Sequence, residues 1–408
     1  MPNKRCGKLL FLVGLLLILT VPVVDSLAFP SVNPTHAYSS LYTKKYDMTF
    51  SLNVANGGPT DINNLKVWIS IISNWTSTFS PYLPSLQYSN LTSINPEPND
   101  TLTDENAGNV VAFYNFSSLA SGDSITIQMS YSIQLVEGRW LINEGAVGTY
   151  NTSDPVYQKY TQPDTNIESD DYQIISKASE IVGSETNPYI KSKLVYDWVV
   201  SNIAYTVQGM ERGALWALTN QQGDCSEFTD LLIALCRASG VPARKIIGWA
   251  FDDLLYASQG SSKSYTDFPG HAWVEVLIPG YGWVLADPTW ANAGYNYWAY
   301  MDTVHVVCIR GQNVTVSNKP EPIIEFSSLY YQYEYSGGSP SVTDSYTFDI
   351  TVIELNSFLI ILDLQIMAMT ICVIAIISVA IGIFSKRKTD VDKSWQSTDS
   401  FDNSCGVV

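Results

Sequence analysis

The sequence predicts an α+β domain that is preceded by an all-β sandwich and followed by a single transmembrane helix. Three observations indicate this order: strand-like alternation in the first third of the chain, helical periodicity followed by strand patterns in the middle, and an uncharged apolar run near the C-terminus. The 408 residues suffice for two globular domains, and a hydrophobic content of 46% can fill their cores. The formal charge of −17 argues against nucleic-acid binding, which requires clustered Lys and Arg side chains.

Both ends of the chain carry patterns typical of membrane insertion. Residues 1–28 begin with basic residues, continue with an apolar run and end on small residues, as a secretory signal peptide does; an uncleaved N-terminal anchor is the alternative. Residues 358–384 are expected to form a transmembrane helix, because the stretch from Ile366 to Phe384 is uncharged and three basic residues follow directly. We therefore expect a single-pass protein of the cell membrane, with its N-terminal domains outside and residues 385–408 as a short cytoplasmic tail.

The region between these ends is expected to face outward and to be glycosylated. It contains the following Asn-x-Ser/Thr sequons: Asn74, Asn90, Asn99, Asn115, Asn151 and Asn313. The six cysteines of the chain are too few to build a disulfide scaffold.

Residues 36–165 are predicted to form the all-β sandwich. Tyr46 to Val54 and Ser124 to Leu135 alternate with a period of two, and turn signals at 56–59 and 121–123 flank the strands. Several short strands without a helical stretch favour an immunoglobulin-like sandwich. A stalk or spacer is the simplest role for such a domain.

Residues 166–305 are predicted to form the α+β domain. Its clearest helix runs from Cys225 to Ser239, with apolar residues on one face and a capping box formed by Asp224 and Glu227. Strand patterns follow at 245–251, 271–278 and 283–286. Residues 306–356 are again strand-like and are assigned to a membrane-proximal β segment, with additions to the sheet of the α+β domain as the alternative.

Cys225 is the first candidate for a chemical role. It stands in the first turn of its helix, where unpaired N–H groups and the helix dipole stabilise an anion and favour a nucleophilic thiolate. Gly223 removes a side chain that could block approach to the sulfur. From the helix alone, a structural cysteine is an equally good interpretation, whereas Cys236 and Cys308 are expected to be buried packing residues.

A histidine and an aspartate can complete a catalytic group with this cysteine. The chain has three histidines. His36 lies in a linker-like stretch, and His305 stands among valines, where a buried ring with satisfied hydrogen bonds is expected. His271 begins one predicted strand and Asp287 ends the next, so a hairpin would bring them together. A carboxylate that orients an imidazole facing a thiolate is the arrangement of a catalytic triad.

Three sequence blocks resemble the core of the transglutaminase-like superfamily. They are Gly223-Asp-Cys-Ser-Glu-Phe-Thr-Asp-Leu-Leu, His271-Ala-Trp-Val-Glu-Val and Gly282-Trp-Val-Leu-Ala-Asp-Pro-Thr, and the resemblance covers roughly residues 170–300. It implies a papain-like fold with Cys225 as nucleophile, His271 as general base and acid, and Asp287 as the orienting carboxylate. The implied chemistry is acyl transfer through a thioester on Cys225, with a protein or peptide as substrate.

Several features around this predicted triad are left open. The backbone N–H of Cys225 is expected to stabilise the oxyanion, with Trp216, Gln221 and Gln222 as candidates for the second donor. The residues expected to wall the cleft are Trp249, Trp283 and Trp290, and the polar loop 252–270 is a lid or a passive connection. No EF-hand-type calcium loop is recognisable, so no cofactor is assigned, although the acidic pair Asp252–Asp253 leaves Ca²⁺ binding open.

The favoured hypothesis is hydrolysis of protein or peptide amides, as by a cysteine peptidase or amidase. A protein-glutamine transglutaminase is the first alternative, because one triad serves both reactions. A non-catalytic surface adhesion or scaffold protein is the alternative from another class. The oligomeric state is not predicted.

Overall fold

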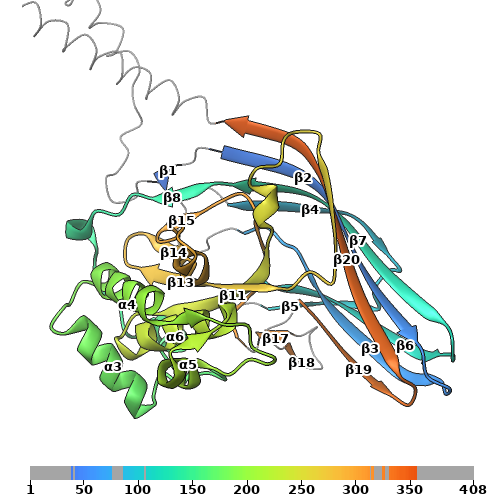
Figure 1. Cartoon of the computed structure of the whole chain (residues 1–408), viewed down its shortest axis with the longest axis horizontal. Coiled ribbons are helices and arrows are strands. Elements are labelled where there is room, and N and C mark those ends of the chain that lie inside the picture. Colours follow the sequence, from blue (N-terminus) through green and yellow to red (C-terminus); the bar gives the residue numbers. More distant parts are fainter. Residues whose placement is uncertain are drawn as a thin grey trace, which may run out of the picture. The chain divides into compact units, whose positions relative to one another are not determined.

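The computed structural model describes residues 38–39, 42–75, 86–104, 107–312, 314–316, 324–326 and 330–355 (Figure 1). The described residues up to Ile353 belong to one compact unit. Within this unit, a β-sandwich and an α+β core share strands and apolar surfaces.

Two antiparallel sheets form the sandwich, with strand orders β12-β20-β2-β7-β4 and β19-β3-β6-β5. Alternate residues of β2 are buried, as the period-two pattern predicts, and they pack against apolar residues of β3 and β6 from the other sheet. The strands of both sheets are β2 (Tyr42–Asn56), β3 (Ile62–Ile71), β4 (Gln87–Asn95), β5 (Asp100–Thr103), β6 (Val110–Leu119), β7 (Ser124–Val136), β12 (Ser262–Thr266), β19 (Tyr331–Ser336) and β20 (Pro340–Leu355).

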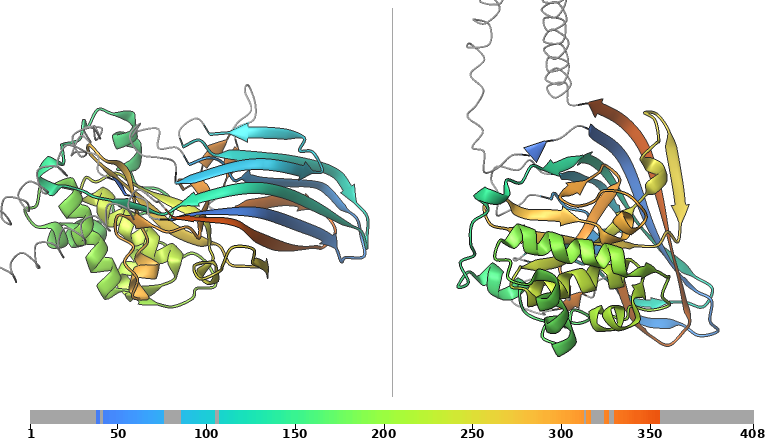
Figure 2. Two further views of the ribbon diagram at one scale, coloured as in Figure 1. Left: turned by 90° about the horizontal axis from the view of Figure 1, so that it is seen from above. Right: turned by 60° about the vertical axis from the view of Figure 1, so that its left-hand side comes forward.

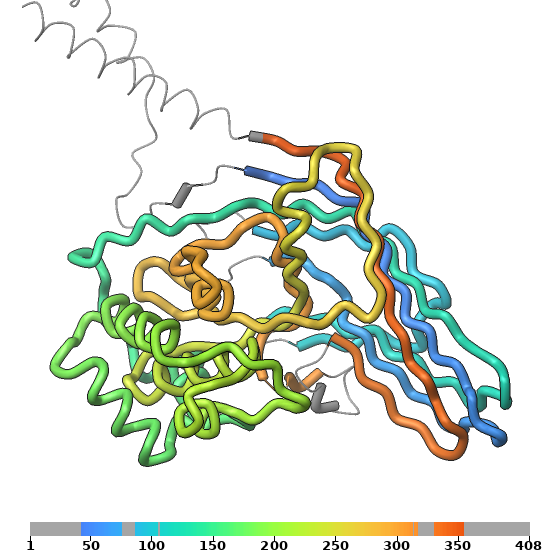
Figure 3. The backbone as a smooth tube through the Cα atoms, in the orientation of Figure 1, coloured from blue at the N-terminus to red at the C-terminus, as the bar shows by residue number. Residues whose placement is uncertain are grey.

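The composition of the sandwich differs from the prediction that residues 36–165 form it alone. The last strand, β20, pairs with β2 near the other end of the described chain, and Figure 2 shows the two side by side. Likewise, β19 pairs with β3. Strand β12 comes from the predicted polar loop 252–270, which runs out along the sandwich and returns to the core (Figure 3). A local alternation pattern shows that a segment is a strand but not which sheet it joins.

The α+β core has one antiparallel sheet of order β14-β13-β11-β16, with helix α6 packed on it. Every residue of α6 from Glu227 to Arg237 is buried, so this helix is the centre of the core. The core elements are α2 (Pro155–Tyr160), α3 (Tyr172–Val182), α4 (Pro188–Asn202), α5 (Ala214–Asn220), α6 (Cys225–Ala238), α7 (Pro288–Asn292), β11 (Ala243–Ala250), β13 (His271–Ile278), β14 (Gly282–Ala286) and β16 (His305–Arg310).

Smaller pairings complete the described fold. They are the sheet of β1 (Tyr38–Ser39), β8 (Gly138–Trp140) and β15 (Tyr300–Met301), the pair β9 (Ala204–Tyr205) and β10 (Gln222–Gly223), and the pair β17 (Val314–Val316) and β18 (Ile324–Phe326). Two single-turn 3₁₀ helices lie at Glu144–Ala146 and Asp252–Leu254.

Strand β16 is the outer strand of the core sheet, and side chains from the sandwich side pair with its free edge. Gln87 accepts from the backbone N–H of Val307 at 2.8 Å and donates to its carbonyl oxygen at 3.0 Å. Asn109 makes the same two contacts with Arg310, at 2.9 and 2.8 Å. Each amide thus replaces one residue of a neighbouring strand, which satisfies backbone groups that burial would otherwise leave unpaired.

The fold class and the localisation predicted from the sequence need a correction. The described part of the chain is mostly β-structure, and none of its helices is long and apolar enough to cross a membrane. The predicted signal peptide (1–28), transmembrane helix (358–384) and cytoplasmic tail (385–408) lie outside the described residues. Among the described residues, nothing supports the predicted single transmembrane helix or the predicted single-pass location in the cell membrane.

The amide of Gln87 should contribute measurably to stability. In a Gln87→Met variant, the buried N–H and C=O of Val307 lose their partners, so we expect the free energy of unfolding to fall by about 2–4 kcal/mol. Gln128→Met, on an exposed position of β7, is the control and should change stability by less than about 0.5 kcal/mol. Urea unfolding followed by tryptophan fluorescence measures the stability of both variants. If Gln87→Met is as stable as the wild type, Gln87 does not hold β16.

Candidate active site

Cys225 is the first residue of α6, the central helix of the core. The Asp224 carboxylate accepts from the N–H of Ser226 at 3.0 Å, and Glu227 accepts from the N–H of Asp224 at 3.0 Å, so the predicted capping box is present. A Cβ on Gly223 would lie 2.2 Å from the Cβ of Glu227. The glycine is therefore required by the close packing of the capping box, and not only by access to the sulfur.

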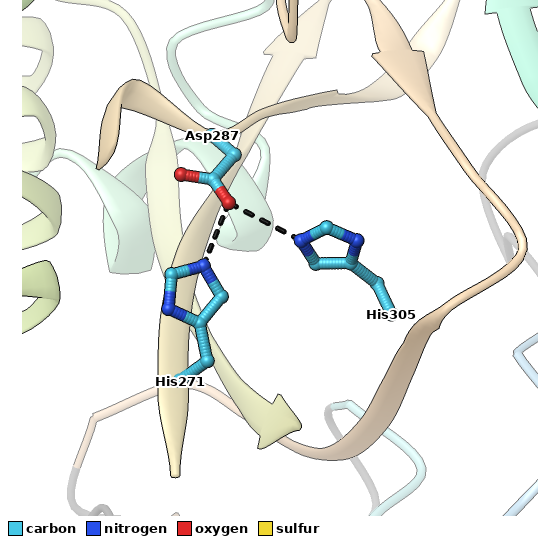
Figure 4. A group of neighbouring side chains, drawn as sticks. All are labelled: His271, Asp287 and His305. Atoms are coloured by element: carbon cyan, nitrogen blue, oxygen red, sulfur yellow. Dashed lines mark hydrogen bonds and ion pairs between the residues drawn. The ribbon is translucent and has the colours of Figure 1, made fainter. Parts of the chain in front are cut away.

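His271 and Asp287 lie together at one end of the hairpin formed by β13 and β14. The register pairs Val274 with Ala286; continued by one residue it brings Asp287 beside Trp273, two residues along the strand from His271 and on the same face. The Nε2 atom of His271 lies 2.7 Å from Oδ2 of Asp287 (Figure 4). Its other ring nitrogen, Nδ1, remains for Cys225, which is a hydrogen-bond partner of this side chain.

The carboxylate of Asp287 is fully buried and has four hydrogen-bond partners. Oδ1 accepts from the N–H groups of Thr289 and Trp290 at 2.8 and 3.0 Å, because Asp287 is also the N-cap of α7. Oδ2 faces Nε2 of His271 and, at 3.2 Å, Nε2 of His305. Burial alone would raise the pKa of this carboxyl, but His271 and the other donors hold the pKa well below its usual range.

The pKa of His271 moves in the opposite direction. Burial would lower it, but the Asp287 carboxylate and then the Cys225 side chain raise it to about 10. The ring stacks against Trp273 at a centroid distance of 5.7 Å. At neutral pH, His271 is therefore set up to carry a proton toward Cys225.

His305 is the residue of the site whose position the sequence did not reveal. It was expected to be a buried ring among valines, and it is buried, with 2% of its surface exposed. However, it lies against Asp287, its Nδ1 is 2.8 Å from Oδ1 of Asp302, and its ring centroid is 5.6 Å from that of His271. The signal was weak because His305 begins β16 and Asp287 follows β14, and the sequence does not show the order or register of these strands in the sheet.

His271, Asp287 and His305 together offer three potential metal-ligating atoms within 4.8 Å of one another. The separation of 2.7 Å between Nε2 of His271 and Oδ2 of Asp287 is that of a hydrogen bond. Two ligand atoms about 2.0–2.1 Å from one tetrahedral ion would lie farther apart. The arrangement is therefore that of a hydrogen-bonded group in which Asp287 joins both histidines (Figure 4).

A cleft of about 340 Å³ lies over Cys225 and His271. One wall is the segment Gln208–Glu211, and Tyr330 from the stretch before β19 is another part of the wall. Glu211 forms an ion pair with the buried Lys245, which is also 2.7 Å from Asp230 of α6. This charge group fixes the wall to the core sheet and to the same helix that carries the cysteine.

The other residues that the sequence suggested for the site lie in several different parts of the structure. Of the described residues lining the cleft, none is Trp216, Gln221 or Gln222, so a second oxyanion donor among them is not supported. Trp249 is in the sandwich core and Trp283 lies under Arg244, whereas Trp290 of α7 has its ring centroid 6.3 Å from that of His271. Cys236 and Cys308 are buried free thiols, as expected.

These features define a class of site: a cysteine at the start of a helix, an imidazole at the start of a strand, and a buried carboxylate just after the following strand. Residues 175–288 match the model of the transglutaminase-like superfamily. The chain therefore contains a transglutaminase-like domain.

Relatives of this chain match over short stretches. An uncharacterized protein of Haemophilus influenzae is 28% identical over 145 residues, which is 32% of this chain and 39% of that protein. The protein-glutamine gamma-glutamyltransferase of Pseudomonas aeruginosa is 32% identical over 94 residues, or 22% of this chain and 14% of that enzyme. The chain thus spans well under half the length of either relative.

A similar solved structure is the one named a "Putative Cysteine Protease" from Cytophaga hutchinsonii. It is 18% identical, covers 77% of this chain and 100% of its own, and has a TM-score of 0.46.

The stability conferred by Asp287 should depend on pH in a defined way. A depressed carboxyl pKa contributes stability that is present above the unfolded value, about 4, and is lost as the pH falls below it. The raised pKa of His271 contributes stability that is fully present below about 6.5 and is lost as the pH rises toward 10. The contribution should therefore be greatest between about pH 4 and 6.5.

An Asp287→Asn variant tests this window because it keeps the N-cap but removes the charge. In urea unfolding at pH 5.5, we expect it to be about 3 kcal/mol less stable than the wild type, and the difference should shrink toward pH 2.5 and toward pH 10. Asp197→Asn on the surface of α4 is the matched control. A difference that stays constant with pH would contradict the ionised pair.

Proposed function

We propose that the protein is a thiol acyl-transfer enzyme that acts on protein or peptide amides through Cys225, His271 and Asp287. The observation that carries the proposal is the joint position of these residues: Cys225 at the start of α6 shares a cleft with His271, and His271 lies 2.7 Å from the buried Asp287. The match of residues 175–288 to the transglutaminase-like superfamily supports it. No cofactor is assigned to the reaction.

The reaction follows from the roles of the two ring nitrogens of His271. The Cys225 thiolate attacks the amide carbon and forms a C–S bond, while the proton on Nδ1 of His271 passes to the leaving amine as the C–N bond breaks. The thioester is then resolved by a second nucleophile, whose proton returns to Nδ1. Asp287 holds Nε2–H throughout and so keeps Nδ1 directed at the sulfur. The N–H of Cys225, at a helix start, is the proposed oxyanion donor.

Water is the proposed second nucleophile, which makes hydrolysis the preferred outcome. This preference rests on the compactness of the described unit. Strand β16 joins the core sheet, and strands β19 and β20 join the sandwich, so these strands do not build separate C-terminal β domains. Cross-linking by a primary amine is the second candidate, because a relative in Pseudomonas aeruginosa is named a protein-glutamine gamma-glutamyltransferase. In that case the thioester is converted to a new amide.

Labelling of the thiol tests whether the site is chemically active. We expect iodoacetamide to alkylate Cys225 rapidly near neutral pH, and His271→Gln to slow this at least about 100-fold because the thiolate loses its partner. Cys225→Ser should not be labelled, and Cys236→Ala, which removes a buried thiol from the same helix, should be labelled like the wild type. Absence of labelling at Cys225 in a folded protein would favour the non-catalytic adhesion or scaffold alternative.

A peptide substrate distinguishes the two reactions. Incubation of a Gln-containing peptide with a primary amine, followed by mass spectrometry, should show hydrolysed peptide and little amine adduct if water is the nucleophile. If the amine adduct predominates, the main reaction is transglutamination and the preference for hydrolysis is wrong. Cys225→Ser is the control for both products.

A further inference from the structure

His305 lies between two buried carboxylates, each of which has four neighbouring hydrogen-bonding groups. Its Nδ1 is 2.8 Å from Oδ1 of Asp302, and its Nε2 is 3.2 Å from Oδ2 of Asp287. Asp302 also accepts from the N–H groups of Val304 and His305 at 2.8 and 3.1 Å, and from the hydroxyl of Tyr297. Asp287 accepts two further backbone N–H groups and the His271 ring.

These contacts indicate where the protons lie. The backbone N–H groups, the His271 ring and the Tyr297 hydroxyl stabilise the ionised forms of Asp287 and Asp302 without any contribution from His305. Each nitrogen of His305 then faces an anionic oxygen and needs a hydrogen to make a favourable contact. Only the imidazolium form of histidine has a donor at both nitrogens.

The charge of this group also bears on His271. The titratable groups that face the His305 ring among the described residues are Asp287, Asp302, His271 and Tyr297. The two carboxylates carry two negative charges, of which His305 neutralises one and a protonated His271 neutralises the other. Without the charge on His305, His271 would face an uncompensated second anion and would release its proton less readily.

The backbone of β16 is shaped to bring His305 to this place. A β-bulge interrupts the pairing of β11 with β16 between Ile247 and Gly248. A Cβ at Gly248 would lie only 1.9 Å from the carbonyl oxygen of Val306, so the approach of the strands requires glycine. Gly248 pairs with His271 on one side and Val307 on the other, which places His305 and His271 on the same face of the sheet.

We propose that His305 is a positioning residue of the active site: as a buried imidazolium that bridges Asp302 and Asp287, it fixes the carboxylate that orients His271 and limits the negative charge acting on that ring. The part of this inference that concerns catalysis rests on the proposed function of Cys225 and His271. The part that concerns the bridge and its protons does not.

The bridge is tested directly by NMR of the full chain labelled with ¹⁵N at histidine. The chain has only three histidines, so His36→Gln and His305→Gln assign the ring signals. We expect both ring nitrogens of His305 to show the imidazolium signature at pH 7 and above, where an exposed histidine is neutral. Asp302→Asn, which keeps the His305 ring, should convert the signal to that of a neutral ring at pH 7. A neutral ring in the wild type would overturn the inference.

The effect on the catalytic pair is tested by the pH dependence of Cys225 alkylation. Replacement of His305 by Gln removes the positive charge beside Asp287 and leaves the Asp302 anion uncompensated, whereas Asp302→Asn removes one charge of each sign. The alkaline limb set by His271 should therefore move upward by about one pH unit in His305→Gln and stay close to its wild-type position in Asp302→Asn. With a cleavable peptide, kcat should fall about tenfold to a hundredfold while KM changes little, because the lost hydrogen bond is to a charged group that does not touch substrate. His36→Gln is the control and should match the wild type in both.

The outcomes separate this inference from the proposed function. Unlabelled Cys225 in the wild type would end the enzyme proposal, while the NMR signature of His305 would still decide the bridge. Labelled Cys225 with the same pH profile in wild type and His305→Gln would overturn the positioning role and leave the enzyme proposal standing. If His305→Gln does not fold, Asp302→Asn and the wild-type spectrum carry the test.

Discussion

A single buried carboxylate, that of Asp287, is the point on which the site depends. An ionised group taken out of water is tolerated only where hydrogen bonds replace its hydration, and Asp287 receives four of them. Two come from the first turn of α7 and two from histidines on β13 and β16. The same requirement therefore fixes the start of a helix, the orientation of His271 and the approach of β16.

A second arrangement of charges holds the helix that begins with Cys225. The capping box of α6 and the ion pairs of Lys245 with Glu211 and Asp230 connect the helix start, the cleft wall and the core sheet. Cys225 and His271 thus line one cleft, and the ion pairs of Lys245 join the helix of Cys225 to the sheet that carries His271. The distance between the Cys225 thiol and the His271 imidazole depends on the positions of α6 and β13. The buried and paired polar groups around the cleft fix these positions.

Much of the core could be predicted because its signals are local. The capping box, the apolar face of α6 and the hairpin that brings His271 near Asp287 are all read from residues close in sequence. His305 could not be placed in this way. Its position depends on a bulge opposite Gly248 and on the pairing of β16 with β11, and neither leaves a period or a motif in the sequence. The prediction of the sandwich was incomplete for the same reason, since β12, β19 and β20 join its sheets from beyond residue 165.

The dependence of β16 on the sandwich argues against a mere spacer role for that domain. Val306 and Cys308 of this strand pack in the sandwich core, while His305 and Val307 lie on the side of the core sheet that bears His271. Gln87 and Asn109 hold the outer edge of the strand, and Tyr46 of β2 donates to the carbonyl of Thr303 just before it. One strand thus has its two faces in two structural layers. A change in the sandwich that shifts β16 must move His305 with it, and through Asp287 that shift reaches the imidazole beside Cys225.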